Sequence, residues 1–336
     1  MSQHAPAPAL QTSPRETLVK VEQLTRRFGA QTVVDSVDFE VQRGEVLGFL
    51  GPNGAGKTTT MRMITGNLAP SAGRITINGL DILDQPKAAK AEIGYLPEQP
   101  PVYRELTVDE YLRFCARLNR IVRGRVVQAM ASAKERCGLG EVGARLIGNL
   151  SKGYQQRVGI AQAIIHSPAV VVLDEPTVGL DPIQIREIRH LIRELGGEHS
   201  VILSTHILPE VQAICDRVQI INRGRLVMSD TIEALTRRRE TADLRLRLVR
   251  PPQAEEIRAA IPGIARVEEC DDGAFLLRPA DAGANTGTTA EQVAQIAVEQ
   301  GWGLRELSPE RRSLEQIFVD ITTGDVNSGR DTETVA

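Results

Sequence analysis

Residues 51–59 have the types and spacing needed to bind phosphate groups. They read GPNGAGKTT, a match to the pattern G-x-x-x-x-G-K-[ST], and they follow the apolar run 46–50, which is typical of a buried strand. Glycines let the backbone curl until successive N–H groups point at the phosphates, and the following helix adds its positive N-terminal end. We expect Lys57 to reach the β- and γ-phosphates of a nucleotide and the Thr58 hydroxyl to contact Mg²⁺. The nucleotide-binding candidates of this loop are Gly51, Pro52, Asn53, Gly54, Ala55, Gly56, Lys57, Thr58 and Thr59.

Two acidic residues and a histidine follow two further apolar runs. Asp174 and Glu175 come directly after residues 170–173, and His206 follows residues 201–203 after a Ser-Thr pair. In doubly wound α/β sheets the ligand crevice lies outside the carboxyl ends of the strands, so these side chains are expected at one crevice. Asp174 is then predicted to reach the Mg²⁺ and Glu175 to polarise the attacking water. A lone histidine after a strand is more often structural, and His206 is assigned to catalysis only as part of this set.

The stretch LSKGYQQR, residues 150–157, connects these features to a known family. It resembles the signature motif of ATP-binding cassette (ABC) ATPases, usually written LSGGQ and followed by an arginine, a helix and the acidic strand. Residues 179–182 resemble the D-loop of that family, His206 its switch histidine, and Phe28 the aromatic residue that it stacks on adenine. The resemblance covers residues 17–235 in the correct order.

The resemblance implies a fold, an activity and a second subunit. The fold is that of an α/β P-loop NTPase of ABC type, and the activity is ATP hydrolysis with Lys57, Glu175 and His206 as catalytic residues. Ser151 suits the N-cap of a helix, so its hydroxyl and the Gly153 backbone offer an anion site. In the family this site closes on the γ-phosphate held by the other subunit, which predicts a homodimer closed by ATP, while pairing with a different cassette remains open. The further nucleotide-binding residues implied by the resemblance are Phe28, Ser151, Gly153 and Asp181.

Departures from the common family pattern indicate a subgroup of the ABC ATPases. The signature has Lys152 and Tyr154 where the consensus has glycine and glutamine. The segment IGYLPEQPP has Glu98 where the family has its Q-loop glutamine, one position before Gln99. These motif variants together resemble those of ATPases of ABC-2 type export systems, including the cassettes of gliding motility and copper-site maturation. Glu98 can act as a hard oxygen ligand of the metal, and we favour it over Gln99 for the Q-loop role.

The elements that position these residues follow from hydrophobic periodicity. A helical subdomain is expected at about residues 98–165, where Thr107 and Glu110 fit a capping box. Residues 97–106 read PEQPPVYREL and are either a docking surface for a permease or an ordinary proline-rich connection. The strand-like segments expected to form an antiparallel β subdomain beside a mixed core sheet are residues 18–21, 37–41 and 74–77, with a turn at residues 78–79.

The C-terminal part is expected to form a small α+β accessory domain at residues 241–322, after an ATP-binding domain at residues 17–236. Residues 243–250 read DLRLRLVR and alternate apolar and basic side chains, which is typical of a half-exposed strand. Residues 280–290 are expected to be a flexible loop, and residues 313–322 resemble the amphipathic C-terminal helix of ABC-2 exporter cassettes. The segments expected outside these domains are a disordered leader at 1–16, an arginine-rich linker or lipid contact at 237–239, and a disordered tail at 323–336.

Composition limits the function classes and the cellular location that remain open. The 336 residues carry 40 basic and 43 acidic side chains, a formal charge of −3, which gives no support for broad nucleic-acid binding. No apolar run approaches the ~20 residues needed to span a bilayer, and the 4 cysteines contain no C-x-x-C pair and are expected to be reduced. We expect a cytoplasmic ATPase that binds peripherally to the membrane through a separate ABC-2 type permease and drives export. The alternatives are a non-transport cassette acting on ribosomes or DNA, and a nucleotide-binding module without hydrolysis.

Overall fold

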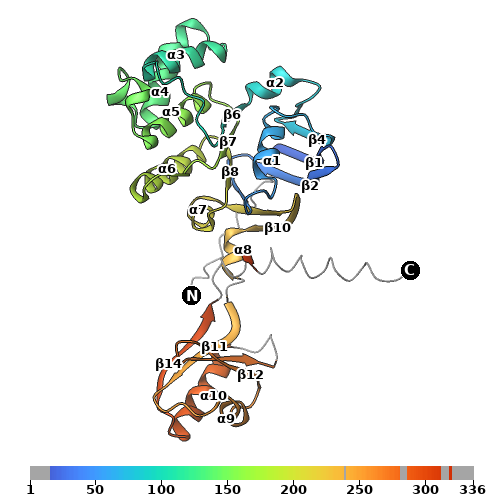
Figure 1. The fold of residues 1–336 in the computed structure, drawn as a ribbon, viewed down its shortest axis with the longest axis vertical. Helices are drawn as coiled ribbons and strands as arrows, with labels where there is room; N and C mark the ends of the chain where they lie inside the picture. The colour runs from blue at the N-terminus through green and yellow to red at the C-terminus, as the bar shows by residue number, and fades with distance from the viewer. Residues whose placement is uncertain (1–15, 238–239, 281–285, 312–317, 320–336) are drawn as a thin grey trace, which may run out of the picture. The chain divides into compact units, whose positions relative to one another are not determined.

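The computed structural model describes residues 16–237, 240–280, 286–311 and 318–319. The chain divides into two compact units between Ile232 and Glu233. Each unit encloses its own cluster of buried apolar side chains. We call them the first unit and the second unit, in chain order (Figure 1).

The first unit alternates strands and helices along most of its length. Its strands are β1 (Thr17–Phe28), β2 (Gln31–Gln42), β3 (Val46–Leu50), β4 (Ala72–Ile77), β5 (Leu80–Asp81), β6 (Ile93–Leu96), β7 (Val170–Asp174), β8 (Ser200–Thr205), β9 (Arg217–Asn222) and β10 (Arg225–Thr231). Its α-helices are α1 (Lys57–Ile64), α2 (Pro86–Ala91), α3 (Val108–Leu118), α4 (Val126–Arg136), α5 (Lys152–Ile164), α6 (Pro182–Leu195) and α7 (Leu208–Ile214). Short 3-10 helices occupy Arg123–Arg125, Gly140–Val142 and Ile147–Asn149.

A mixed sheet forms the centre of the first unit, with strand order β10-β9-β3-β8-β7-β6. Strands β6, β7, β8, β3 and β9 run parallel to one another, and β10 pairs antiparallel with β9. Every residue of β3, β7 and β8 is buried, as expected for apolar parallel strands covered on both faces. The mixed core sheet predicted from the sequence is therefore confirmed.

The register of the parallel strands brings three chain segments to one edge of this sheet. Leu50 at the end of β3 pairs with Thr205 at the end of β8, and Asp174 at the end of β7 pairs with Ser204. The chain segments that follow these three strands therefore begin side by side.

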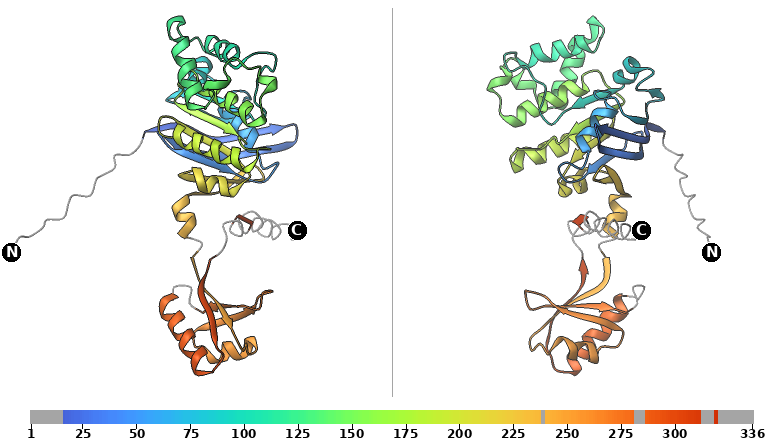
Figure 2. Two further views of the ribbon diagram at one scale, coloured as in Figure 1. Left: turned by 90° about the vertical axis from the view of Figure 1, so that its left-hand side faces the viewer. Right: turned by 45° about the vertical axis from the view of Figure 1, so that its right-hand side comes forward.

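A second sheet and a group of helices complete the first unit. The second sheet is antiparallel, with order β2-β1-β4-β5, and Asn78 and Gly79 form the predicted turn with φ angles of 47° and 78°. Helices α3, α4 and α5 pack together as a helical subdomain, apart from β1, β2 and β4 (Figure 1, Figure 2). Thr107 and Glu110 form the predicted capping box at the start of α3.

The second unit has the element order βαββαβ. Its elements are β11 (Glu240–Leu248), α9 (Ala254–Ala260), β12 (Ile264–Glu269), β13 (Phe275–Pro279), α10 (Thr286–Glu299) and β14 (Leu304–Arg311), preceded by α8 (Ile232–Arg237). The strands form an antiparallel sheet with order β12-β13-β11-β14; α9 packs on β12, and α10 packs on β11 and β14. This arrangement is ferredoxin-like, which refines the α+β class predicted from the sequence.

The predicted alternation along β11 is present. Leu244 and Leu246 are fully buried in the apolar cluster of the second unit. Arg245 and Arg247 lie between and beyond them in sequence, and both form ion pairs with Asp272. The period of two therefore separates an apolar face that packs from a charged face that is solvated.

The loop predicted at residues 280–290 is wrong from Thr286 onward, because α10 begins there. Val293 and Ala297 are fully buried and anchor the helix on the sheet. Once this part is helical, adding residues at its N-terminal end costs little free energy, because each further residue gains a backbone hydrogen bond.

Several sequence-based expectations lie outside the described residues: the leader at 1–15, arginines 238–239, most of the C-terminal helix at 313–322, and the tail at 323–336.

Shortening Leu277 to alanine is expected to destabilise the second unit alone. Leu277 is fully buried in the apolar cluster of that unit. Such a substitution costs about 2–5 kcal/mol, through lost burial and the cavity left behind. Scanning calorimetry of the full chain should show one unfolding transition for each unit, and ATP identifies the transition of the first unit by shifting it. Leu277→Ala should leave the midpoint of that transition unchanged and lower the midpoint of the other. An equal fall of both transitions would show that the two units unfold as one.

Candidate nucleotide site

The phosphate loop lies between β3 and α1, at the sheet edge where β7 and β8 also end. A Cβ atom on Gly51 would lie 2.4 Å from the carbonyl oxygen of Ile221, and Gly56 has a φ of 106°, so both positions require glycine. Gly56 is also the N-cap of α1, and among the described residues no side chain caps this helix. The first N–H groups of α1 are therefore available to an anion.

The Lys57 ammonium is buried over this loop. Its Nζ donates to the carbonyl oxygen of Gly51 at 2.8 Å and to that of Pro52 at 3.3 Å, and it lies 3.4 Å from Oε1 of Glu175. The Lys57 and Glu175 side chains are only 6% and 8% exposed, so solvent screens this ion pair weakly. A phosphate oxygen entering the loop would compete with Glu175 for the ammonium.

Glu175 and His206 are in direct contact. Nδ1 of His206 lies 3.0 Å from both carboxylate oxygens of Glu175, and the imidazole is 42% exposed. Glu175 has a φ of 50°, a left-handed conformation that residues other than glycine rarely adopt. Its N–H donates to the carbonyl oxygen of Ser204 at 2.8 Å, which holds this turn against β8. The arrangement can accept a proton from a water molecule at the carboxylate.

The Asp174 carboxylate is fully buried, and neither of its oxygens has a hydrogen-bond partner among the described residues. Burial raises its pKa; the neighbouring hydroxyls of Ser204 and Thr58 oppose this effect without reaching hydrogen-bond geometry, and Glu175 and Glu98 add to it. A buried carboxylate without partners is costly unless a cation joins it. Asp174, Thr58 and Glu98 together supply hard oxygen donors of the kind that Mg²⁺ uses beside substrate phosphates, so the residues present fit this ion.

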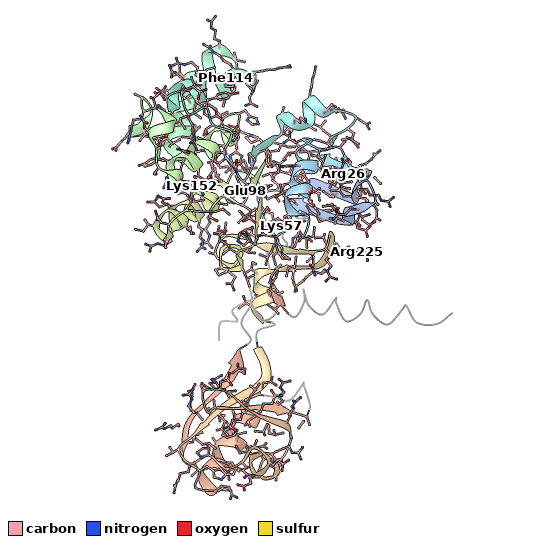
Figure 3. All side chains as sticks on the ribbon, in the orientation of Figure 1. Arg26, Lys57, Glu98, Phe114, Lys152 and Arg225 are labelled. Atoms are coloured by element: carbon pink, nitrogen blue, oxygen red, sulfur yellow. The ribbon has the colours of Figure 1, made fainter. Side chains whose placement is uncertain are left out.

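Lys57, Thr58, Glu98, Glu175 and His206 line one cavity, and Lys57 and Glu98 are labelled in Figure 3. The fully buried Asp174 is not among the described residues that line it. Among the described residues the lining includes Glu98 and does not include Gln99, which favours Glu98 for the Q-loop role. Val33 and Val178 also line the cavity. Sequence reasoning missed them, because a single valine carries no chemical signal. The full lining is Val33, Asn53, Gly54, Gly56, Lys57, Thr58, Thr59, Glu98, Glu175, Val178 and His206.

Phe28 does not belong to this lining. It is 47% exposed at the end of β1, and the Arg26 guanidinium lies 4.4 Å from the centre of its ring. One face of the ring is thereby engaged in a cation–π contact, and an adenine would stack on the other face or displace the arginine.

The signature segment forms a separate cleft. The Ser151 hydroxyl accepts from the Tyr154 N–H at 3.4 Å, so Ser151 is the N-cap of α5 as predicted. The Asp181 carboxylate accepts from the N–H groups of Ile183 and Gln184, both at 2.9 Å, and caps α6. This signature cleft is lined by Ser151, Gly153, Tyr154, Arg157, Gln184, Glu187 and Ile188. It shares no lining residue with the Lys57 cavity, so within one chain the signature does not meet its own phosphate loop.

A phosphate loop, a strand-end acidic pair and a histidine at one edge of a mixed sheet define an ATPase cassette. Residues 34–178 match the family model described as ABC transporter. The chain is 39% identical over 224 residues to the bacitracin transport ATP-binding protein BcrA of Bacillus licheniformis, a match that covers 66% of this chain and 72% of that protein. It is 30% identical over 318 residues to the ABC transporter ATP-binding protein YdbJ of Bacillus subtilis, covering 94% and 99%. A solved ATP-binding subunit of an ABC transporter superposes with a TM-score of 0.60 at 33% identity, covering 66% and 93%.

The chain therefore belongs to the ATP-binding proteins of ABC transporters, as the signature resemblance indicated. Members of this family bind ATP, generally with Mg²⁺, and hydrolyse it; they dimerise and act with membrane permease subunits. In the described part of the chain, no helix combines the length and the apolar character that crossing a membrane requires.

Replacing Asp174 with asparagine is expected to stabilise the nucleotide-free protein and to weaken its response to Mg-ATP. The folded-state pKa of Asp174 lies above the unfolded value, so proton binding favours the folded state at low pH, and this contribution is lost as the pH rises through the folded pKa. Near neutral pH, removing the unpartnered charge should raise the free energy of unfolding by about 1–3 kcal/mol.

Thermal melts at neutral and acidic pH, with and without Mg-ATP, test this expectation. The difference between Asp174→Asn and the unaltered protein should shrink as the pH falls, because Asp174 itself becomes protonated. A variant that melts at lower temperature without nucleotide at neutral pH would contradict the electrostatic argument.

The Glu175→Gln variant is expected to bind ATP but to hydrolyse it at least about 100-fold more slowly, because an amide cannot accept the proton of the attacking water. Nucleotide binding by fluorescence and turnover by phosphate release separate the two effects. Glu194→Gln, which alters an exposed carboxylate on α6, is the matched control. Turnover that is unchanged in Glu175→Gln would remove this residue from catalysis.

Proposed function

We propose that this chain is the ATP-hydrolysing subunit of an ABC-2 type exporter. It works as a homodimer on the cytoplasmic face of the membrane, together with a separate permease. The observation that carries the proposal is a short segment, residues 97–106, that runs from the nucleotide cavity to an exposed aromatic surface. The ABC-2 subgroup assignment is supported by the LSKGY motif at residues 150–154 and the YLPE motif at residues 95–98.

The site geometry supports direct hydrolysis. A water oxygen attacks the γ-phosphorus of ATP, the bond to the β,γ-bridging oxygen breaks, and the products are ADP and inorganic phosphate. Glu175 accepts the proton of the water, and His206, 3.0 Å away, fixes the carboxylate that receives it. The Lys57 ammonium exchanges its ion pair with Glu175 for contacts with the phosphate oxygens. Asp174, Thr58 and Glu98 would hold Mg²⁺, which would supply further positive charge to the phosphates.

The separation of the two clefts supports action as a dimer. The anion site at Ser151 and Gly153 needs a phosphate that its own chain holds elsewhere, in the Lys57 cavity. A second copy related by two-fold symmetry would supply each signature with the phosphate loop of its partner. ATP then lies between the two copies and favours their closed arrangement.

The segment between β6 and α3 links the cavity to a surface that fits a permease. Glu98 lines the cavity, and five positions later Tyr103 is 47% exposed. Its ring contacts those of Tyr111 and Phe114, with centroid distances of 5.9 and 5.7 Å. Phe114, which is labelled in Figure 3, is 43% exposed. The Tyr111 hydroxyl donates to the carbonyl oxygen of Pro101 at 2.8 Å and fastens the segment to α3. An exposed aromatic cluster of this kind suits an amphipathic helix of a partner, so we favour docking over a simple connection.

Replacing Phe114 with aspartate is therefore expected to separate the cassette from its permease. In detergent-solubilised membranes of the host, the tagged Glu175→Gln protein with ATP should co-purify with a protein that has several apolar segments of about 20 residues each. Adding Phe114→Asp should reduce that recovery at least about tenfold, since a charge at an interface core is strongly unfavourable. In the protein with Glu175 intact, Phe114→Asp should leave the basal ATPase rate within about twofold, because it touches no nucleotide ligand.

Leu83→Asp is the matched control, because Leu83 is 54% exposed but lies outside the aromatic cluster. Recovery with ribosomal proteins or nucleic acid, and without a membrane protein, would overturn the exporter proposal in favour of a non-transport cassette. Equal recovery with and without the Phe114 charge would move the docking surface elsewhere.

A further inference from the structure

Glu210 is a charged side chain with no exposed surface, and the mechanism above does not use it. It lies in the first turn of α7 and is 0% exposed. It is not among the described residues that line the nucleotide cavity. Because a buried carboxylate persists only where partners satisfy its oxygens, its contacts show what its position serves.

Three side chains from three different segments meet this carboxylate. The Thr177 hydroxyl donates to Oε1 at 2.5 Å, and the Thr205 hydroxyl donates to Oε2 at 2.9 Å. The Arg189 guanidinium of α6 lies 3.8 Å from Oε1 and provides the opposite charge. Oε1 thus holds the turn after β7, and Oε2 holds the end of β8.

The two threonines belong to the segments that carry the proposed catalytic pair. Thr177 is two residues after Glu175, in the turn with the left-handed backbone, and Thr205 directly precedes His206. The Thr205 hydroxyl also accepts from the Ile207 N–H at 3.1 Å, which fixes the backbone on the other side of His206. Both hydroxyls and their backbones are buried, so neither segment can shift without disturbing Glu210.

We propose that Glu210 is a positioning residue, whose carboxylate sets the separation and orientation of Glu175 and His206 from behind the site. The inference rests on the catalytic roles of these two residues in the proposed function. Holding the turn after β7 and the end of β8 on one rigid group keeps Nδ1 of His206 at 3.0 Å from the Glu175 carboxylate. Displacing reacting groups by about 1 Å can lower a rate by roughly 100-fold, so a hydrogen bond behind the site can control turnover.

A purely structural role for Glu210 predicts a different outcome. In that case its hydrogen bonds would stabilise α7 and the end of β8, and their loss would lower stability and turnover whether or not His206 is present. A positioning role acts through the contact between Glu175 and His206, so its loss should have little effect once the imidazole has been removed and that contact no longer exists. Measuring each substitution in both backgrounds distinguishes the two roles.

The test removes the hydroxyl donors and keeps the buried carboxylate, because deleting Glu210 would leave Arg189 without its partner and endanger folding. Thr177→Val and Thr205→Val preserve the side-chain shape, and Thr177→Ser and Thr205→Ser preserve the hydroxyl. Each variant is made in the full chain, with His206 present and in the His206→Ala background. The matched control is Thr65→Val, which removes a buried hydroxyl that donates to the Met61 carbonyl at 2.9 Å at the end of α1.

With His206 present, each valine variant should lower kcat about tenfold with KM for ATP within about twofold, the pattern of an interaction made in the transition state. The serine variants should recover kcat to within about threefold of the unaltered protein, since they restore the donor. In the His206→Ala background the same valine substitutions should change the remaining rate less than about twofold.

Equal losses in the two backgrounds, or a rise of KM in place of the fall in kcat, would overturn the inference. A loss of similar size in Thr65→Val would also overturn it, because any buried hydroxyl would then have the same effect. Failure of the proposed function has a separate signature: Glu175→Gln and His206→Ala would themselves leave turnover unchanged.

Discussion

The parallel pairing of β3, β7 and β8 is the constraint on which the site depends. Each of these strands is buried along its whole length, with both faces covered. Their register aligns Leu50 with Thr205 and Asp174 with Ser204. The phosphate loop, the acidic pair and the histidine are therefore brought together by packing, although about 150 residues separate the first from the last along the chain.

The site contains groups that are unfavourable until a ligand joins them. The Asp174 carboxylate lacks a hydrogen-bond partner among the described residues, and Glu175 occupies a left-handed backbone conformation. Among the described residues Lys57 forms one ion pair, with Glu175, and the Asp174 and Glu98 carboxylates lie nearby, so negative groups outnumber positive ones. Strain and unpartnered charge are common where a ligand is meant to complete a structure. A metal ion at Asp174 and phosphates at Lys57 would supply the missing partners.

The sequence predicted what depends on local chemistry. The phosphate loop, the Ser151 cap and the Thr107 capping box are each recognisable from a few neighbouring residues, and both predicted caps stand at helix starts. The remaining features are non-local. Glu210 reads as an ordinary acid in a first helical turn, and only the fold shows that Thr177 and Thr205 converge on it. The strand order of the ferredoxin-like unit also depends on contacts between distant segments, which periodicity does not encode.

The division of phosphate loop and signature between two clefts has a consequence for how activity depends on concentration. In the proposed homodimer, an isolated copy can hold ATP but lacks the second half of its site. Where copies are dilute, the rate of hydrolysis should rise with the square of their concentration, because two must meet for each active site. A permease that gathers two copies raises their local concentration far above that in the surrounding solution. Cassettes made in excess of their membrane partner then consume little ATP, so hydrolysis is confined to complexes that can use it.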